Sequence, residues 1–125
     1  MAHSYEDLLV WQKAMDLVEE VYRLIKLLPK EENFGISAQM RRSAISIPSN
    51  IAEGQSRHTT KEFINFLSIA NGSKSELKTQ ILICIRLKYI TEIQAKSAIS
   101  LCEEIGKMIF SMVAKLQSGT RKPDH

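Results

Sequence analysis

The stretch from residue 43 to 57 reads SAISIPSNIAEGQSR and places a proline inside a helical pattern. Pro48 cannot donate to the carbonyl of Ala44, so we expect the helix to bend there and to continue. Gly54 is expected to end it in the left-handed conformation. The apolar side chains around the proline recur at spacings of four and three residues, which places them on one helical face: Met40, Ala44, Ile47 and Ile51. The stretch therefore predicts a kinked helix of a helical core.

The same period extends over nearly the whole chain, and no strand pattern interrupts it. We expect four helices, at about residues 5–28, 35–54, 60–88 and 92–117. Pro29 stops the first, and Thr59 and Thr91 open the third and fourth as the first residues of capping boxes. Because the connections are short, the sequence predicts an all-α, up-down-up-down antiparallel four-helix bundle. It forms one domain over residues 1–117, and residues 118–125 are expected to be a disordered tail.

Two details of packing follow from the pattern. In the first helix, we expect an apolar stripe with a second apolar stripe beside it. The first consists of Trp11, Met15, Val18, Tyr22 and Ile25, and the second of Leu17, Val21, Leu24 and Leu28. In the third helix, the small residues around Gly72 predict a close approach of two helices, with Ser73 in a polar layer. A ligand contact through Asn71, Ser75 and Lys78 is the alternative.

Composition limits the class of protein. The 125 residues are 44% hydrophobic and 25% charged, as in an ordinary globular domain. No apolar run approaches the ~18 residues of a membrane span, and the first residues lack a secretory signal pattern. We expect a cytoplasmic protein that does not bind a membrane. Cys84 and Cys102 stand in apolar surroundings and are interpreted as core thiols, not as a disulfide or metal ligands.

The candidates for catalysis are few. His3 and His125 lie near the termini and His58 lies in a turn, so no nucleophile has an obvious base. The isolated glycines do not form a phosphate-binding loop. The sequence therefore predicts a protein that is not an enzyme, with no catalytic residue, metal or cofactor.

The helices carry more apolar surface than one bundle needs, which predicts a homo-oligomer. The alternative is that wide apolar arcs reflect tight packing in a small bundle. The candidate interface residues lie outside the main stripes: Ile45, Ala52, Ile64, Leu82, Leu101, Met108 and Met112.

The formal net charge is +3, and its excess lies in residues 59–90, which hold five basic and two acidic residues. Nucleic acid and a solvated helix face explain such an excess about equally well. The candidate phosphate contacts are Arg41, Arg42, Arg57, Lys61, Lys74 and Lys78. Arg42 shares a polar stripe with Ser46, Ser49 and Glu53, and its alternative role is an ion pair. Trp11 and the phenylalanines are expected in the core, so nothing identifies an RNA sequence.

Several segments together resemble the bacterial four-helix-bundle proteins encoded in 23S rRNA intervening sequences. The similarity spans roughly residues 7 to 116. The matching segments are Leu9–Ala14, Gln39–Ala44, Ser46–Gly54, Glu62–Phe63 with Phe66–Leu67, and Ala70–Ser73 with Glu76–Leu77. The resemblance implies a homopentameric ring, which suits the surplus apolar faces. A more distant similarity is to the accessory protein of diversity-generating retroelements, a pentameric bundle that binds nucleic acid and a reverse transcriptase.

Two functional hypotheses follow, and the family's own biochemical role is not settled. In the first, the protein is an accessory factor that binds RNA or DNA, with structured RNA favoured, through basic residues repeated around the ring. In the second, the ring is a scaffold for a protein partner, and the basic residues are only solvated. A small-ligand site at the polar stripe of Arg42 and Glu53 is a third reading.

Overall fold

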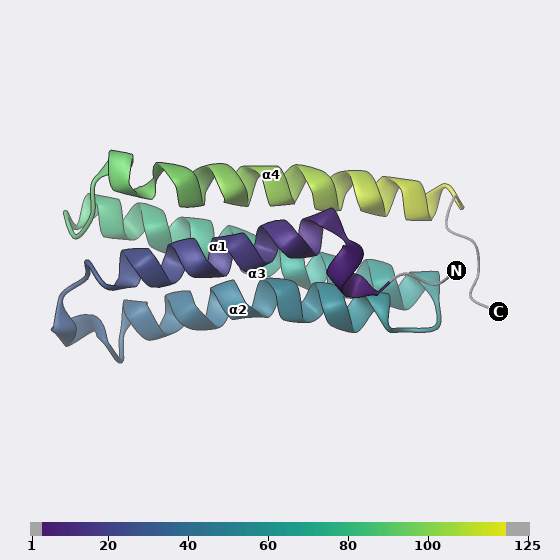
Figure 1. Cartoon of the computed structure of the whole chain (residues 1–125), viewed down its shortest axis with the longest axis horizontal. Helices are drawn as coiled ribbons and strands as arrows, with labels where there is room; N and C mark the ends of the chain where they lie inside the picture. The colour runs from purple at the N-terminus through teal and green to yellow at the C-terminus, as the bar shows by residue number, and fades with distance from the viewer. Residues whose placement is uncertain (1–3, 120–125) are drawn as a thin grey trace.

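Four antiparallel helices form the protein, and the computed structural model describes residues 4–119 (Figure 1). Each helix contacts two neighbours, so that α1 packs on α2, α2 on α3, α3 on α4, and α4 closes the bundle against α1. The predicted all-α four-helix bundle is confirmed. In chain order the elements are the 3-10 helix η1 (Tyr5–Asp7), α1 (Leu9–Ile25), the 3-10 helix η2 (Lys30–Glu32), α2 (Ile36–Gln55), α3 (Thr60–Arg86) and α4 (Glu92–Gln117).

The core takes one apolar stripe from each helix, and in α1 it is the second of the two predicted stripes, not the first. The buried side of α1 is made by Val10, Ala14, Leu17, Val21 and Leu24. Trp11, Val18 and Ile25 lie half-buried at its flank, and Met15 and Tyr22 are exposed. The two stripes are neighbours on the helix surface, and which one is buried depends on where α2 and α4 lie. The sequence of one helix does not contain that information.

The predicted first helix, residues 5–28, is wrong at both ends. Leu8 is extended, with φ −75° and ψ 126°, and separates η1 from α1. At the other end α1 stops at Ile25, and the amides of Leu27 and Leu28 donate to carbonyls three residues back. Proline disfavours the α conformation in the residue before it, so the chain leaves the helix ahead of Pro29.

The second helix runs without interruption through Pro48, from Ile36 to Gln55. The bend expected at Pro48 stays a prediction. The expected role of Gly54 is wrong, because this residue is buried inside the last turn of α2. A Cβ atom at Gly54 would lie 2.8 Å from Cβ of Phe66 and 2.9 Å from Cδ1 of Phe63. Glycine here permits the close approach of α2 and α3.

A polar seam joins α2 to α3 along their shared edge. The hydroxyls of Ser46 and Ser73 share a hydrogen bond of 2.8 Å, so Ser73 lies in a polar layer as predicted. The Asn50 amide donates to the carbonyl and hydroxyl oxygens of Ser46, at 2.8 and 2.9 Å. The close approach expected at Gly72 is wrong, since a Cβ atom there would meet nothing within 4 Å.

Of the two predicted capping boxes, the one at Thr91 is complete, and at Thr59 the described residues form only the hydroxyl half of the box. The Thr59 hydroxyl accepts from the amide of Glu62, and Thr91 forms the full capping box with Gln94. The fourth helix has the predicted bounds, whereas α3 ends at Arg86 because Lys88 adopts a left-handed φ of 67°. Of the predicted tail, 118–125, only residues 118 and 119 are described, and the rest lies outside the described residues. None of the described helices combines the length and apolar character needed to cross a membrane.

Candidate nucleic-acid interface

One end of the bundle is strongly basic. It consists of residues 22–42 and 83–96, which include η2 and the turn from α3 to α4, and it lies on the left in Figure 1. These segments hold eight basic and three acidic residues, a net charge of +5. The rest of the described chain holds seven basic and ten acidic residues, a net charge of −3. We call this part of the molecule the basic end.

The basic side chains of this end are available to a partner. Seven are exposed and Arg41 is half-buried. Within residues 4–119 only Arg23 of the eight forms an ion pair, with Glu20. Some of them also complement the negative C-terminal ends of α1 and α3, which is a structural reason for their presence. The eight are Arg23, Lys26, Lys30, Arg41, Arg42, Arg86, Lys88 and Lys96.

Two of the predicted phosphate contacts, Arg41 and Arg42, belong to the basic end. The Arg41 guanidinium donates to the backbone carbonyl of Asn33 at 2.9 Å and so lies beside the loop that precedes α2. Arg42 is exposed and has no hydrogen bond or ion pair among the residues that the structure describes. The predicted alternative was an ion pair within or between chains. The described chain does not form the first kind, and the second stays a prediction.

The Glu32 carboxylate forms hydrogen bonds to both segments of the basic end, residues 22–42 and residues 83–96. Glu32 accepts from the amide of Ile36 at 3.3 Å through Oε1 and from the Tyr89 hydroxyl at 2.9 Å through Oε2. Tyr89 lies between α3 and α4, so this contact links the loop before α2 to the opposite helix pair. The hydrogen bond to Glu32, then burial, raises the pKa of Tyr89. One of the three acidic residues of this end is thus engaged within the fold.

The loop before α2 also carries an aromatic side chain that the sequence placed in the core. Phe34 is 99% exposed. Phe110 on α4 is 78% exposed, while Phe63 is buried as predicted. The expectation that all phenylalanines lie in the core is wrong for Phe34 and Phe110. Phe34 sits between Asn33 and Gly35, just ahead of the first apolar position of α2, and this loop context was the signal in the sequence.

The predicted contacts Arg57 and Lys61 lie at the opposite end of the bundle, around the turn from α2 to α3. Arg57 pairs with Glu53 at 2.7 Å and lies over the ring of Phe66, 5.0 Å from its centroid. Lys61 is exposed on the first turn of α3. The structure does not bring these two residues together with Arg41 and Arg42.

The remaining two candidates lie midway along α3, beside α4. Lys78 pairs with Glu103 at 3.3 Å. Lys74 is half-buried and lies against Gly106, where an added Cβ would be 2.9 Å from its Nζ. Lys74 and the Lys78 partner Glu103 border a hollow of about 500 Å³. Its lining is Asn71, Lys74, Glu103, Gly106, Lys107 and Phe110. The six predicted contacts therefore lie in three separate parts of the molecule.

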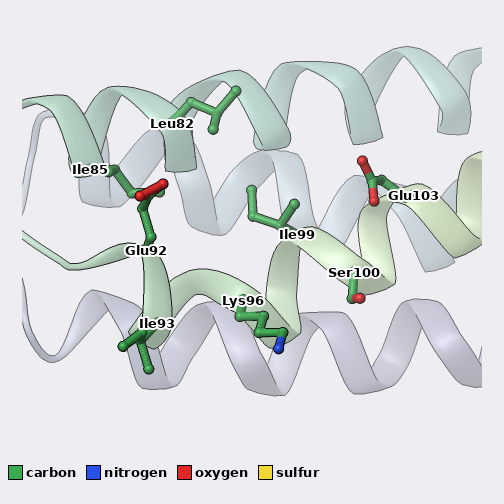
Figure 2. A pocket seen from close by; sticks show the side chains of 8 residues that line it. All are labelled: Leu82, Ile85, Glu92, Ile93, Lys96, Ile99, Ser100 and Glu103. Atoms are coloured by element: carbon green, nitrogen blue, oxygen red, sulfur yellow. The ribbon is translucent and has the colours of Figure 1, made fainter.

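Two apolar hollows lie on opposite sides of the bundle. The first, of about 340 Å³, lies between α1 and α2 and includes the predicted interface residues Ile45 and Ala52. The second, of about 420 Å³, lies between α3 and α4 and includes Leu82. Figure 2 shows Leu82 and Ile85 of α3 across from Ile99 of α4 in this hollow, with Ile93 at its edge. Ile93 is 86% exposed.

The other predicted interface residues lie elsewhere. Met108 and Met112 line a hollow with Leu8 and Leu9, on the side where α1 meets α4. Leu101 is half-buried against the core, and Ile64 borders a hollow on α3. The predicted set is therefore spread over several faces and does not form one surface.

The cysteines are both free and buried, as core thiols should be. Burial raises the pKa of Cys84 and of Cys102 to about 11, so neither is a ready nucleophile. Among residues 4–119, no group of three His, Cys, Asp or Glu side chains is placed to hold a metal ion.

Comparison with known proteins agrees with this architecture. Residues 6–111 match the sequence profile of a family described as 23S rRNA-intervening sequence protein. The fold is similar to a crystal structure from Bacteroides thetaiotaomicron VPI-5482, described as a protein of unknown function from the S23 ribosomal protein family. The two share 31% sequence identity with a TM-score of 0.78, over 84% of this chain and 98% of the other. No curated protein matches this chain.

Proposed function

The chain belongs to the family of 23S rRNA-intervening sequence proteins, and from this premise we propose that it is a non-enzymatic, homo-oligomeric accessory factor that binds structured RNA. The observation that carries the proposal is the basic end, with its net charge of +5 against −3 for the rest of the described chain. A surface that neutralises phosphates releases counterions, and this supplies most of the affinity of binding that does not depend on sequence.

The placement of the apolar hollows supports self-association. They lie between α1 and α2 and between α3 and α4, which are opposite sides of the bundle. Two different surfaces on opposite sides favour head-to-tail contacts, and such contacts close into a ring when the rotation allows it. The resemblance to pentameric relatives suggests five copies.

Self-association through the apolar hollows would increase the effect of the basic end. If the copies contact one another through the long sides of the bundle, they lie side by side with their axes in the same direction. Every basic end then lies on the same face of the ring. A modest charge per chain then becomes a large one, because five ends of +5 each carry +25. A folded RNA presents many phosphates over such a distance, so it gains more contacts from a ring than from a single chain.

The test is an RNA titration with charge variants matched in number. The double variant Lys26→Glu and Arg42→Glu reverses two exposed charges of the basic end, and Lys61→Glu with Lys107→Glu reverses two exposed charges outside it. Light scattering after size exclusion gives the oligomer, and a labelled RNA hairpin is titrated at two salt concentrations. We expect only the first variant to weaken binding, by about tenfold or more, and to lower the salt slope by ~0.7–0.9 per lost contact.

Other outcomes contradict specific parts of the proposal. Equal losses in both variants mean that the basic end is not the binding surface. A wild-type oligomer that leaves RNA free even at low salt rejects RNA binding and favours a scaffold for a protein partner. A monomer rejects the ring.

A further inference from the structure

We propose that Phe34 is a stacking platform for an unpaired nucleobase, so that the basic end selects RNA with looped-out or single-stranded bases over perfect duplex. This inference rests on the proposed function and names its substrate class. It begins from the exposure of the side chain, 99%, which is the highest of any large hydrophobic residue in the described chain. A single exposed apolar residue needs no explanation by itself, but this one stands within a basic surface.

Two cations lie beside Phe34 in a loop that also carries Glu31 and Glu32. Lys30 lies in η2, four residues before the phenylalanine, and Arg41 donates to the carbonyl of Asn33, the residue next to it, at 2.9 Å. Proteins that bind single-stranded nucleic acid combine these two elements, basic groups for the backbone and an aromatic face for a base. Stacking one base contributes about five- to a hundredfold in affinity and tolerates any sequence, because every base has a π face.

The loop is held in place before any ligand binds. The amide of Asn33 donates to the carbonyl of Lys30 and that of Gly35 to the carbonyl of Glu32, both at 3.0 Å. The Glu32 carboxylate fixes the loop from a second side through Ile36 and Tyr89. Gly35 also leaves room for this carboxylate, since a Cβ there would lie 2.5 Å from its Oε1. A fixed loop presents Phe34 with little entropic cost on binding.

A second copy of the chain is a poorer occupant of this position. Phe34 lies in the loop before α2 and lines neither apolar hollow. The hollow between α3 and α4 reaches Glu92, Ile93 and Lys96 of the basic end, but not this loop. Two basic ends facing one another would bring together two charges of +5, which repel. A nucleobase arrives attached to phosphates and therefore has the opposite charge.

The experiment compares Phe34→Ala with Phe110→Ala, an exposed phenylalanine on α4 outside the basic end. The probes are a labelled RNA hairpin with an unpaired loop and a blunt RNA duplex with the same number of phosphates. We expect Phe34→Ala to weaken hairpin binding by about five- to a hundredfold and duplex binding by less than about twofold, with an unchanged salt slope. Phe110→Ala should leave both affinities unchanged.

Phe34→Trp supplies a readout that a loss of structure does not imitate. This variant should keep hairpin affinity, and stacking should quench the fluorescence of the new tryptophan when unpaired RNA binds. Lack of quenching, or equal losses for hairpin and duplex in Phe34→Ala, overturns the inference. An oligomer that dissociates in Phe34→Ala assigns the residue to a protein contact instead.

The failure of the inference is distinguishable from failure of the proposed function. If Phe34→Ala changes nothing while Lys26→Glu with Arg42→Glu weakens both RNAs, phosphate binding stands and base stacking is wrong. If the wild-type protein binds neither RNA, both proposals are wrong.

Discussion

Glycine at position 72 occupies an exposed helical site with open space around its α-carbon. A Cβ atom added there meets nothing within 4 Å, and its φ is not left-handed. Glycine inside a helix loses more conformational freedom on folding than alanine does. We expect Gly72→Ala to raise the free energy of unfolding by about 0.5–1 kcal/mol, measured by urea denaturation.

Gly54→Ala is the matched control, and we expect it to change the free energy of unfolding in the opposite direction. Its Cβ atom would lie 2.8 Å from Phe66 Cβ, and 3.3 Å from the backbone oxygen of Phe63, so α2 and α3 would have to separate. This substitution should destabilise the protein by ~1–3 kcal/mol, as overpacking usually does. If both alanines act in the same direction, the packing described for these two helices is wrong.

The two buried thiols make stability depend on pH in the alkaline range. Burial is the main reason why the pKa of Cys84 and of Cys102 rises from 9.0 to about 11. The folded state therefore holds these protons more tightly than the unfolded state does. The stability that this supplies is complete below pH 9 and is lost as the pH rises through 9 toward 11.

Equilibrium unfolding between pH 7 and 11 measures this loss. The double variant Cys84→Ala and Cys102→Ala should show a shallower decline than the wild type, although lysines and tyrosines titrate in both. The native thiols should also react slowly with a thiol reagent at pH 8 and quickly after denaturation. If the wild type and the double variant lose stability with pH in the same way, the buried thiols are not the cause of the alkaline loss of stability.

At the scale of the helices, the sequence predicted correctly a helix end that is determined by a short capping motif. The start of α4 follows from the capping box at Thr91, which the sequence displays directly. The ends of α1 depend on the extended residue Leu8 and on the turn before Pro29. The role of Gly54 depends on Phe63 and Phe66 from another helix, which no reading of α2 alone contains.

The end of α3 allows a test of the left-handed backbone conformation at Lys88. Lys88 adopts φ 67°, where a side chain is strained and glycine is not. We expect Lys88→Gly to stabilise the protein by about 1 kcal/mol relative to Lys88→Ala, measured by thermal or urea unfolding.

The comparison with alanine isolates the conformational effect, because both variants remove the same charge from the basic end. Equal stabilities of the glycine and alanine variants mean that α3 does not end in the left-handed conformation. Lys88→Ala alone, compared with the wild type, reports the contribution of this charge to RNA binding.

At the scale of the whole molecule, the sequence identified part of the candidate site but not its extent. Arg41 and Arg42 were predicted and lie in the basic end. The count of charges along the chain placed the excess in residues 59–90, a segment that spans the length of the bundle. Lys61 and Lys88 from that segment therefore lie at opposite ends. The basic end exists only because folding brings residues 22–42 beside residues 83–96.

The two apolar hollows determine how copies of the chain would assemble. A face between α1 and α2 that binds a face between α3 and α4 makes a heterologous contact, in which each copy uses both faces. A twofold dimer would instead use one face twice. Ile45, 45% exposed, and Ile93, 86% exposed, each lie at only one of the two faces. A charge at either position should block association and leave the fold intact.

Mixing two such variants distinguishes the two modes of assembly. Ile45→Glu retains the face between α3 and α4, and Ile93→Glu retains the face between α1 and α2, so each variant alone should be monomeric in light scattering. An equimolar mixture contains one intact pair of complementary faces, so head-to-tail assembly predicts a heterodimer that cannot grow, because both of its outer faces carry a glutamate. If the copies instead form a twofold dimer through a single face, the variant whose glutamate lies at the other face should dimerise on its own, without mixing. A mixture that stays monomeric, or either variant forming the wild-type oligomer alone, contradicts the head-to-tail ring.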